Sequence, residues 1–472
     1  MFYFLISLTA LILGYFIYGS FVDKFFGSTD NEKTPANTLK DGVDFEPMPK
    51  YKVLLIQILN IAGVGPIFGP ILGVLYGPIA LVWIVIGSIF AGAVHDYLSG
   101  MLSIRNKGVT VPTYTVKYLG KWSSWPIRIS TLLLLFFVGV AFIMAPARLL
   151  HGLFDNISVQ IFILIIFAYY FLATILPVNK IIGKLYPIFG AMLIVMSVLL
   201  LVALGFSEHE FYAIANDGFF TSYHPNDLPI WPLMFITIAC GAISGFHSTQ
   251  SPIMARCVQN ENSGKMIFYG GMIAEGAIAL IWATLAMSFY PTVEALFEVT
   301  STQSPAGVVS GISFGLLGGI GGTLAVIAII ILPITSGDTA FRSIRLTLSE
   351  IFSIGQSKAM QRLAIAIPLF IIAFFMTKND FDVIWRYFGV TNQLLASIML
   401  WTGAAYFASK GKSHLMASLP ATFMSAVCIT YLAMDKQLGF GIEYVTSTYI
   451  GIIGAVALFI AFVYFYVKKP NL

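Results

Sequence analysis

Repeated long runs of apolar residues constrain this sequence more than any other feature. A stretch of about 20 such residues is long enough to cross the hydrocarbon core of a bilayer as an α-helix. Hydrophobic residues make up 58% of the chain and charged residues only 10%, whereas soluble domains carry roughly 25% charged residues. The sequence therefore predicts an all-α polytopic membrane protein with about 13 transmembrane helices, at 2–22, 53–73, 77–101, 127–149, 159–177, 184–205, 231–251, 264–290, 318–340, 362–377, 387–408, 415–434 and 447–467.

Basic residues indicate how these helices are oriented. Most of the 26 lysines and arginines fall in alternate connections, and the intervening segments 206–230 and 291–317 contain none. Because Lys and Arg favour the cytoplasmic side, we expect the N-terminus outside and the C-terminus in the cytoplasm. The first run has no basic start and no small-residue cleavage site, which favours a retained helix over a signal peptide. The polar segment 23–52 is then a cytoplasmic loop.

The second apolar run contains a stretch that should break its helix. Residues 59–70 read LNIAGVGPIFGP, and inside a helix Gly costs about 1 kcal/mol and Pro about 3 kcal/mol relative to Ala. In hydrocarbon the freed backbone groups need partners, so an unwound stretch persists only where protein or a water-filled cavity surrounds it. We therefore expect the helix to unwind at 63–66, next to a functional site.

A matching interruption occurs five helices later, where residues 240–252 read CGAISGFHSTQSP. Since five is odd, the two units would cross the membrane in opposite directions, which is typical of an inverted repeat that holds its substrate where the broken helices meet. This predicts two five-helix repeats at 53–205 and 231–408, an extracellular loop at 206–230, and peripheral helices within 1–22 and 409–472. Close helix packing through small residues is the alternative explanation of each glycine cluster.

Five stretches carry a resemblance to a known family. IAGVGPIFGP, AVHDYLSG, SGFHSTQSP, SGDTAFRSIR and WRYFGVTNQLLA resemble signature stretches of the carbon starvation protein A (CstA) family. The resemblance implies a LeuT-like fold with two discontinuous helices in the bacterial inner membrane. It also implies secondary active import of short peptides by alternating access during nutrient limitation. Pyruvate or another small carboxylate, taken up with protons, is the alternative substrate.

The two interrupted segments supply the candidate substrate-binding residues. Carbonyl groups of an unwound helix suit a cation, and helix-terminal N–H groups suit a carboxylate. The candidates are Gln57, Asn60, Gly63 and Gly65 in the first segment and Gly245, His247, Ser248 and Gln250 in the second. The alternatives are interhelical hydrogen bonding by the two amide side chains and a neutral histidine satisfied by neighbouring backbone.

Ionisable residues inside the apolar runs are candidates for proton handling. Glu275 lies near the middle of the eighth run, where a carboxyl group serves either as a proton carrier or as a structural acid. His95 and Asp96 are adjacent on a helix, so they point about 100° apart, which favours a helix-end anchor or inner gate over a metal site. Arg148 lies near a helix end, a position that favours extension of its side chain to the membrane interface over binding of a substrate carboxylate.

A coupling-ion site is expected on the ninth run. In the LeuT-type plan that the resemblance implies, Thr335, Ser336 and Asp338 face the first broken helix and complete a sodium site with carbonyl groups near Ala62. Oxygen ligands suit such a hard cation, and a protonatable group is the alternative occupant. The structural alternatives are hydroxyl groups bonded to their own helix and a local pair between Asp338 and Arg342.

Other functional classes lack their motifs in this sequence. There is no glycine-rich phosphate loop followed by Lys-Ser/Thr, so ATP hydrolysis is not expected. Cys240, Cys257 and Cys428 lie far apart, without the spacing of a metal site, and the basic residues form no patch for nucleic acid. We therefore expect no enzyme activity and no cofactor beyond a coupling H⁺ or Na⁺, with substrate and membrane lipid as partners. A channel or a membrane enzyme is the less favoured alternative, and the oligomeric state is left open.

Overall fold

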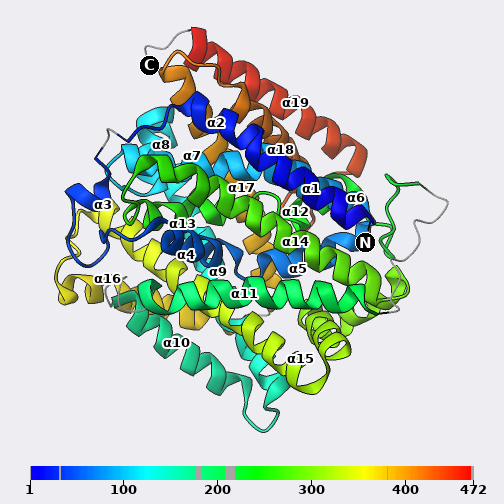
Figure 1. The fold of residues 1–472 in the computed structure, drawn as a ribbon. Coiled ribbons are helices and arrows are strands. Elements are labelled where there is room, and N and C mark those ends of the chain that lie inside the picture. The colour runs from blue at the N-terminus through cyan, green and yellow to red at the C-terminus, as the bar shows by residue number, and fades with distance from the viewer. Residues whose placement is uncertain (1, 31–32, 176–181, 208–217, 380, 469–472) are drawn as a thin grey trace.

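The computed structural model describes residues 2–30, 33–175, 182–207, 218–379 and 381–468, which form a bundle of long helices (Figure 1). The predicted connection at 178–184 and the predicted outer loop at 206–230 therefore lie partly outside the described residues. Within the described ranges, β structure is limited to one isolated bridge between Met48 and Val258. The predicted all-α class is confirmed.

The helices follow the predicted apolar runs. Those before residue 206 are α1 (Phe2–Phe16), α2 (Tyr18–Phe26), α3 (Pro35–Thr38), α4 (Lys50–Ala62), α5 (Gly65–Gly73), η1 (Val74–Tyr76), α6 (Ile79–Ile86), η2 (Gly87–Gly92), α7 (Ala93–Arg105), α8 (Val111–Leu119), η3 (Lys121–Ser123), α9 (Ser124–Leu153), α10 (Val159–Ile175) and α11 (Ile182–Gly205). Those after residue 218 are α12 (Ile230–Thr237), α13 (Gly245–Ala255), η4 (Glu261–Ser263), η5 (Lys265–Tyr269), α14 (Gly270–Phe289), α15 (Val293–Phe352), α16 (Ala359–Met376), α17 (Phe381–Ser409), α18 (Leu415–Met434), α19 (Tyr444–Phe462) and η6 (Val463–Lys468).

Many of these helices are suited to cross a membrane. Among the described residues, nine helical segments are long and apolar enough to span it, and the bent pair α4 and α5 brings the number to ten. Helix α10 is apolar but shorter, and the pair α12 and α13 is interrupted by seven residues without helix, 238–244. The polytopic class is therefore confirmed, while the count of about 13 and the inverted repeat stay predictions.

Several helices begin or end a few residues away from the predicted positions, and α2 and α15 illustrate why. Helix α2 ends at Phe26, four residues past the predicted end at 22, so the polar loop starts later. Helix α15 carries one label from Val293 to Phe352, but non-helical backbone at Ser304 and Gly318 divides it. The part after Gly318 begins where the predicted run 318–340 begins and continues past its end to Phe352. Both changes extend helices beyond the apolar run that marks the membrane crossing, because hydropathy does not register a helix outside the hydrocarbon.

The two interrupted helix pairs lie at the centre of the bundle (Figure 1). Helix α5 packs against α14, and α13 packs against α4, α7 and α17. Helix α15 runs along α9, and α18 and α19 pack on each other beside α17. In Figure 1, α10 and α16 lie on the opposite side of the molecule from α19. The packing therefore places the segments that sequence analysis singled out in the protein interior.

The connection between α2 and α4, residues 27–49, is held against the bundle by charged side chains. Asp44 is buried and accepts hydrogen bonds from Arg342 Nη1 at 3.1 Å and Arg345 Nη2 at 3.2 Å. Burial of the Asp44 carboxyl raises its pKa, but the positive charges of Arg345 and Arg342 together lower the pKa by a larger amount. The net result is a pKa of about 2 instead of 3.8. This connection thus ties the segment before the first broken helix to the end of α15.

Candidate functional site

The first break separates α4 from α5 by a 47° bend. Gly63 has φ +46°, a conformation that residues with a Cβ rarely adopt, and a Cβ there would lie 2.9 Å from Phe142 Cζ. Helix α5 restarts at Gly65 with a proline in its first turn, where a missing N–H costs little because it would have no helical partner. The predicted unwinding at 63–66 is therefore present, confined to Gly63 and Val64 between the two helices.

The second break lies between Thr237, where α12 ends, and Gly245, where α13 begins. Asn392 of α17 caps the start of α13, since its Oδ1 accepts hydrogen bonds from Phe246 N at 2.7 Å and Ser244 Oγ at 3.1 Å. The bond from Phe246 N satisfies one of the backbone donors that a helix N-terminus leaves unpaired. The unwound segment is thus 238–244, and His247, Ser248 and Gln250 lie in the helix that follows it.

The two breaks meet through a face of α5 that carries no side chains. A Cβ at Gly65 would overlap the side chain of Cys240, and one at Gly73 would overlap the side chain of Ile238. A Cβ at Gly69 would lie 3.1 Å from the carbonyl oxygen of Thr237. Glycines four residues apart share one side of a helix, so this glycine face lets α5 lie directly on the unwound segment.

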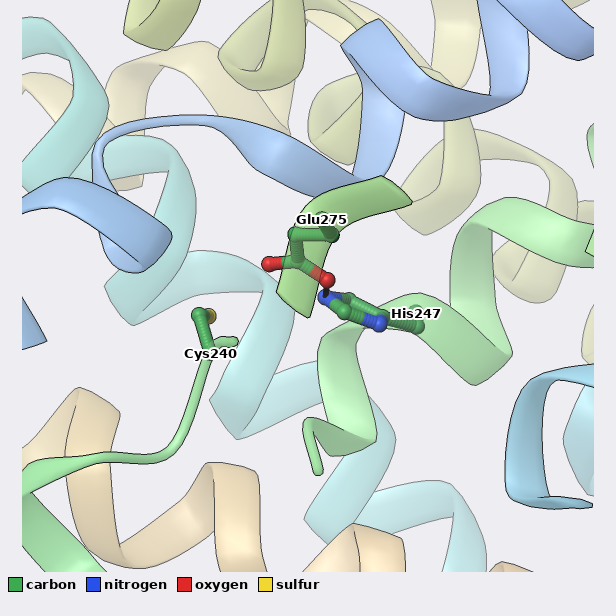
Figure 2. Close-up of side chains that lie close together, drawn as sticks. All are labelled: Cys240, His247 and Glu275. Atoms are coloured by element: carbon green, nitrogen blue, oxygen red, sulfur yellow. Dashed lines mark ion pairs between the residues drawn. The ribbon is translucent and has the colours of Figure 1, made fainter. Parts of the chain in front are cut away.

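A chain of buried ionisable side chains lies beside the second break. His95 Nδ1 lies 2.7 Å from Asp96 Oδ1, and Asp96 Oδ2 lies 2.9 Å from His247 Nδ1. On its other side, His247 Nε2 lies 3.3 Å from Glu275 Oε2. All four side chains are fully buried. Figure 2 shows the Glu275 carboxylate facing the His247 ring, with Cys240 on the unwound segment beside them.

This His–Asp–His–Glu chain joins residues that sequence analysis treated separately. His95 and Asp96 contact each other and, through Asp96, His247, so the interpretation of this pair as a helix-end anchor omitted its main partner. They lie within the segment Ile79–Arg105, away from its end. Charged groups in such surroundings are costly unless paired. The contacts therefore link four titratable groups into one continuous buried chain.

The amide side chains of the first broken helix have unused hydrogen-bonding capacity. Gln57 Nε2 donates to Ser251 Oγ at 3.3 Å. Within the part of the chain that the structure describes, Gln57 Oε1 and both polar atoms of the Asn60 amide are buried without a hydrogen-bond partner. Ser248, by contrast, donates to the Gly245 carbonyl at 2.6 Å. Buried polar groups of native proteins are rarely unpaired, so Gln57 and Asn60 are placed as ligand-binding groups would be.

The residues of the predicted ion site lie on α15 next to the first break. Ser336 Oγ donates to the Leu59 carbonyl at 3.1 Å, which places α15 against α4. The Thr335 hydroxyl donates to the Leu332 carbonyl of its own helix at 2.9 Å. Asp338 Oδ2 accepts from the Tyr186 hydroxyl at 2.6 Å. The site near Ala62 stays a prediction, and Ser336 is the member that contacts the broken helix.

The candidate residues are enclosed in this conformation. Gln57, Asn60, His247 and Glu275 are fully buried. Cavities of about 880 Å³ and 720 Å³ open elsewhere, the first between α17, α18 and α19 and the second between α2, α6 and α18, and no candidate residue lines either of them. Arg148, near the end of α9, is exposed, unlike the buried residues of this cluster. Access to the meeting point of the two breaks therefore requires the helices to move.

Asp96, Cys240 and Asn392 belong to this site but were not among the predicted binding residues. Two of them lie in stretches that carry the family resemblance, AVHDYLSG and WRYFGVTNQLLA. That signal marked the stretches without indicating which side chain faces the second break. Cys240 opens the interrupted stretch CGAISGFHSTQSP, and cysteine spacing alone gave no reason to pair it with His247 and Glu275.

Comparisons with known proteins agree with this architecture. The sequence matches the family described as carbon starvation protein CstA over residues 1–153, 127–316 and 305–431. An uncharacterized membrane protein of Haemophilus influenzae is 46% identical over 64% of this chain and 94% of its own length. The peptide transporter CstA of Bacillus subtilis is 26% identical over 89% of this chain and 87% of its own. A manganese transporter variant from Eremococcus coleocola is 12% identical, with a TM-score of 0.54 over 91% of this chain and 98% of that one, which shows a shared fold.

Proposed function

This chain belongs to the CstA family, and on that basis we propose that it is a secondary active transporter that imports short peptides by alternating access. Relatives in Bacillus subtilis and Escherichia coli are named peptide transporter CstA. We place the protein in the bacterial inner membrane with its N-terminus outside, and expect it to serve nutrient uptake during carbon starvation. The alternative substrate is pyruvate or another small carboxylate.

Two observations carry the proposal together: α5 lies directly on the second break, and α4, on the other side of the first break, holds buried amide atoms without a hydrogen-bond partner among the described residues. A short peptide has donors and acceptors along its backbone and a charge at each end. The free donor and acceptor atoms of Asn60 and the free oxygen of Gln57 match the peptide group. Discontinuous helices that meet inside the membrane are where transporters of this general kind hold their substrates.

The test is counterflow in proteoliposomes that contain the purified protein. Vesicles preloaded with unlabelled di- or tripeptide should accumulate labelled peptide transiently and with saturation, because a carrier exchanges substrates through one site. Pyruvate should neither compete nor exchange. Exchange of pyruvate without peptide would establish the alternative substrate, and flux without saturation or counterflow would favour a channel.

Proton coupling through Glu275 is part of the proposal. Glu275→Gln removes the titratable group at similar volume, so accumulation driven by an imposed pH gradient should fall to near the level without a gradient, whereas counterflow should persist. Glu298→Gln is the matched control, because Glu298 is exposed and its loss should change neither measurement. A Glu275→Gln protein that still accumulates peptide in response to pH would make this residue structural.

Sodium coupling at Thr335, Ser336 and Asp338, with carbonyl groups near Ala62, is the second candidate. The contact between Ser336 Oγ and the Leu59 carbonyl favours it, because a cation held between α15 and α4 would use these oxygens. Ser336→Ala should then raise the sodium concentration needed for half-maximal uptake. If uptake by the Thr335→Ala and Ser336→Ala proteins matches wild type at every sodium concentration, the site does not couple sodium.

A further inference from the structure

Cys240, His247 and Glu275 reach one point from three different segments. They come from the unwound stretch, from α13 and from α14, and one ligand atom of each lies within 4.8 Å of the other two. All three residues are buried, His247 and Glu275 completely so. Thiolate, imidazole and carboxylate are the three side-chain groups that bind Zn²⁺ in proteins.

The hydrogen bonds of His247 determine what its second nitrogen presents to this point. With Asp96 ionised, the proton of the ring lies on Nδ1, 2.9 Å from Asp96 Oδ2. Nε2 then holds either a second proton or a metal ion, and it lies 3.3 Å from a carboxylate oxygen of Glu275. Two electron-rich atoms at this distance require a positive species between or beside them. Such a carboxylate–histidine arrangement is also the usual support of a metal-binding histidine.

A metal ion satisfies more of these atoms than a proton does. Among the described residues, neither carboxylate oxygen of Glu275 has a well-formed hydrogen bond, and His247 Nε2 also lacks one. The Cys240 thiol donates a weak hydrogen bond to Ser244 Oγ at 3.4 Å, which a metal–thiolate bond would replace. A proton shared by Nε2 and Oε2 would still leave the second oxygen of Glu275 without a partner among the described residues. A divalent ion would bind all three groups, and the thiolate and carboxylate would neutralise its charge.

We propose that Cys240, His247 and Glu275 bind a divalent transition-metal ion of the zinc class, with a fourth position open. Binding displaces the thiol proton of Cys240, and the ion then joins the unwound segment to α13 and α14. These elements surround the second break. A bound ion therefore holds them in the conformation in which the candidate residues are buried, and this inhibits transport. The inhibition, but not the binding, rests on the proposed transport function.

Binding is tested on the purified full-length protein in detergent after treatment with a chelator. Co²⁺ serves as the spectroscopic probe, because a cobalt–thiolate bond adds a charge-transfer absorption that oxygen and nitrogen ligands do not give. We expect this band to saturate at one Co²⁺ per chain and to disappear on addition of Zn²⁺. Cys240→Ser should abolish the band, while Cys428→Ser, which alters another buried free cysteine, should retain it.

A second variant alters Asp96, which contacts His247 Nδ1 but is not one of the three proposed metal ligands. Asp96→Asn should weaken Zn²⁺ binding about 10–100-fold, the range typical of such supporting groups, without removing the cobalt–thiolate band. Thermal unfolding without metal shows whether each variant is folded. Absence of saturable Co²⁺ binding to the wild-type protein, or a band that persists in Cys240→Ser, would overturn the site.

Transport provides the final measurement. Zn²⁺ should reduce peptide uptake by the wild-type protein reversibly, with recovery on chelation. The same Zn²⁺ concentration should leave the uptake that the Cys240→Ser protein retains unchanged relative to that protein without Zn²⁺. Uptake that continues while Zn²⁺ saturates the site would overturn the inhibitory role. A wild-type protein that binds Co²⁺ but moves no peptide would instead refute the transport proposal and leave the metal site standing.

Discussion

Gly65→Leu is expected to reduce uptake to the background of protein-free vesicles while the protein still inserts into the membrane. A Cβ at this position would overlap the side chain of Cys240, so a leucine would force α5 away from the unwound segment. Overpacking of this kind costs about 1–3 kcal/mol, which a large helical bundle can tolerate. The loss should therefore appear in transport rather than in expression or in the elution volume of the purified protein.

A matched substitution separates this effect from a general loss of helix packing. Gly152 also lies in a helix, and no atom comes within 4 Å of a Cβ added there. Gly152→Leu should therefore leave uptake near the wild-type level. Near-normal uptake by the Gly65→Leu protein would show that contact between the two breaks is not needed for transport.

Asp44→Ala is expected to destabilise the protein by about 3–5 kcal/mol, the cost of removing one partner from a buried ion pair. The change leaves Arg342 and Arg345, both buried, without the carboxylate that they contact. The midpoint of thermal unfolding in detergent should fall clearly. Asp30→Ala is the control, because Asp30 is an exposed residue of the same connection, and this change should leave the midpoint unaltered.

Low pH should weaken the same ion pair in the wild-type protein, because it protonates Asp44. Because the pKa of Asp44 is lowered from 3.8 to about 2 in the folded state, its contribution to stability is fully present above the pKa of the unfolded chain. The contribution is lost as the pH falls from about 4 towards 2. The Asp44→Ala protein should therefore lose less stability than wild type over this interval, and equal losses would contradict the role of the ion pair.

The sequence predicts the helical class and the first break because both depend on local composition. Long apolar runs need helices in a bilayer, and Gly63 adopts a backbone conformation that other residues avoid. The helix ends were less predictable. The part of α15 after Gly318 begins with its apolar run but continues past it to Phe352, where the hydropathy pattern no longer marks a helix.

The site was only partly predictable, because its contacts depend on how helices rotate against each other. His247 and Glu275 could be selected as ionisable groups within apolar runs. The contact between Asp96 and His247 joins residues 151 positions apart in the sequence, and nothing local indicates which face of α7 turns towards α13. Cys240 was dismissed on spacing along the chain, whereas its partners are brought near by the second break.

The glycine face of α5 has a mechanical consequence. Most helix contacts interlock, because side-chain ridges of one helix fill grooves of the other, and sliding then requires many side chains to change rotamer together. Along Gly65, Gly69 and Gly73, one of the two surfaces is bare backbone, so no ridges have to disengage. Helix α5 can therefore slide along the unwound segment without a rotamer change on its own glycine face.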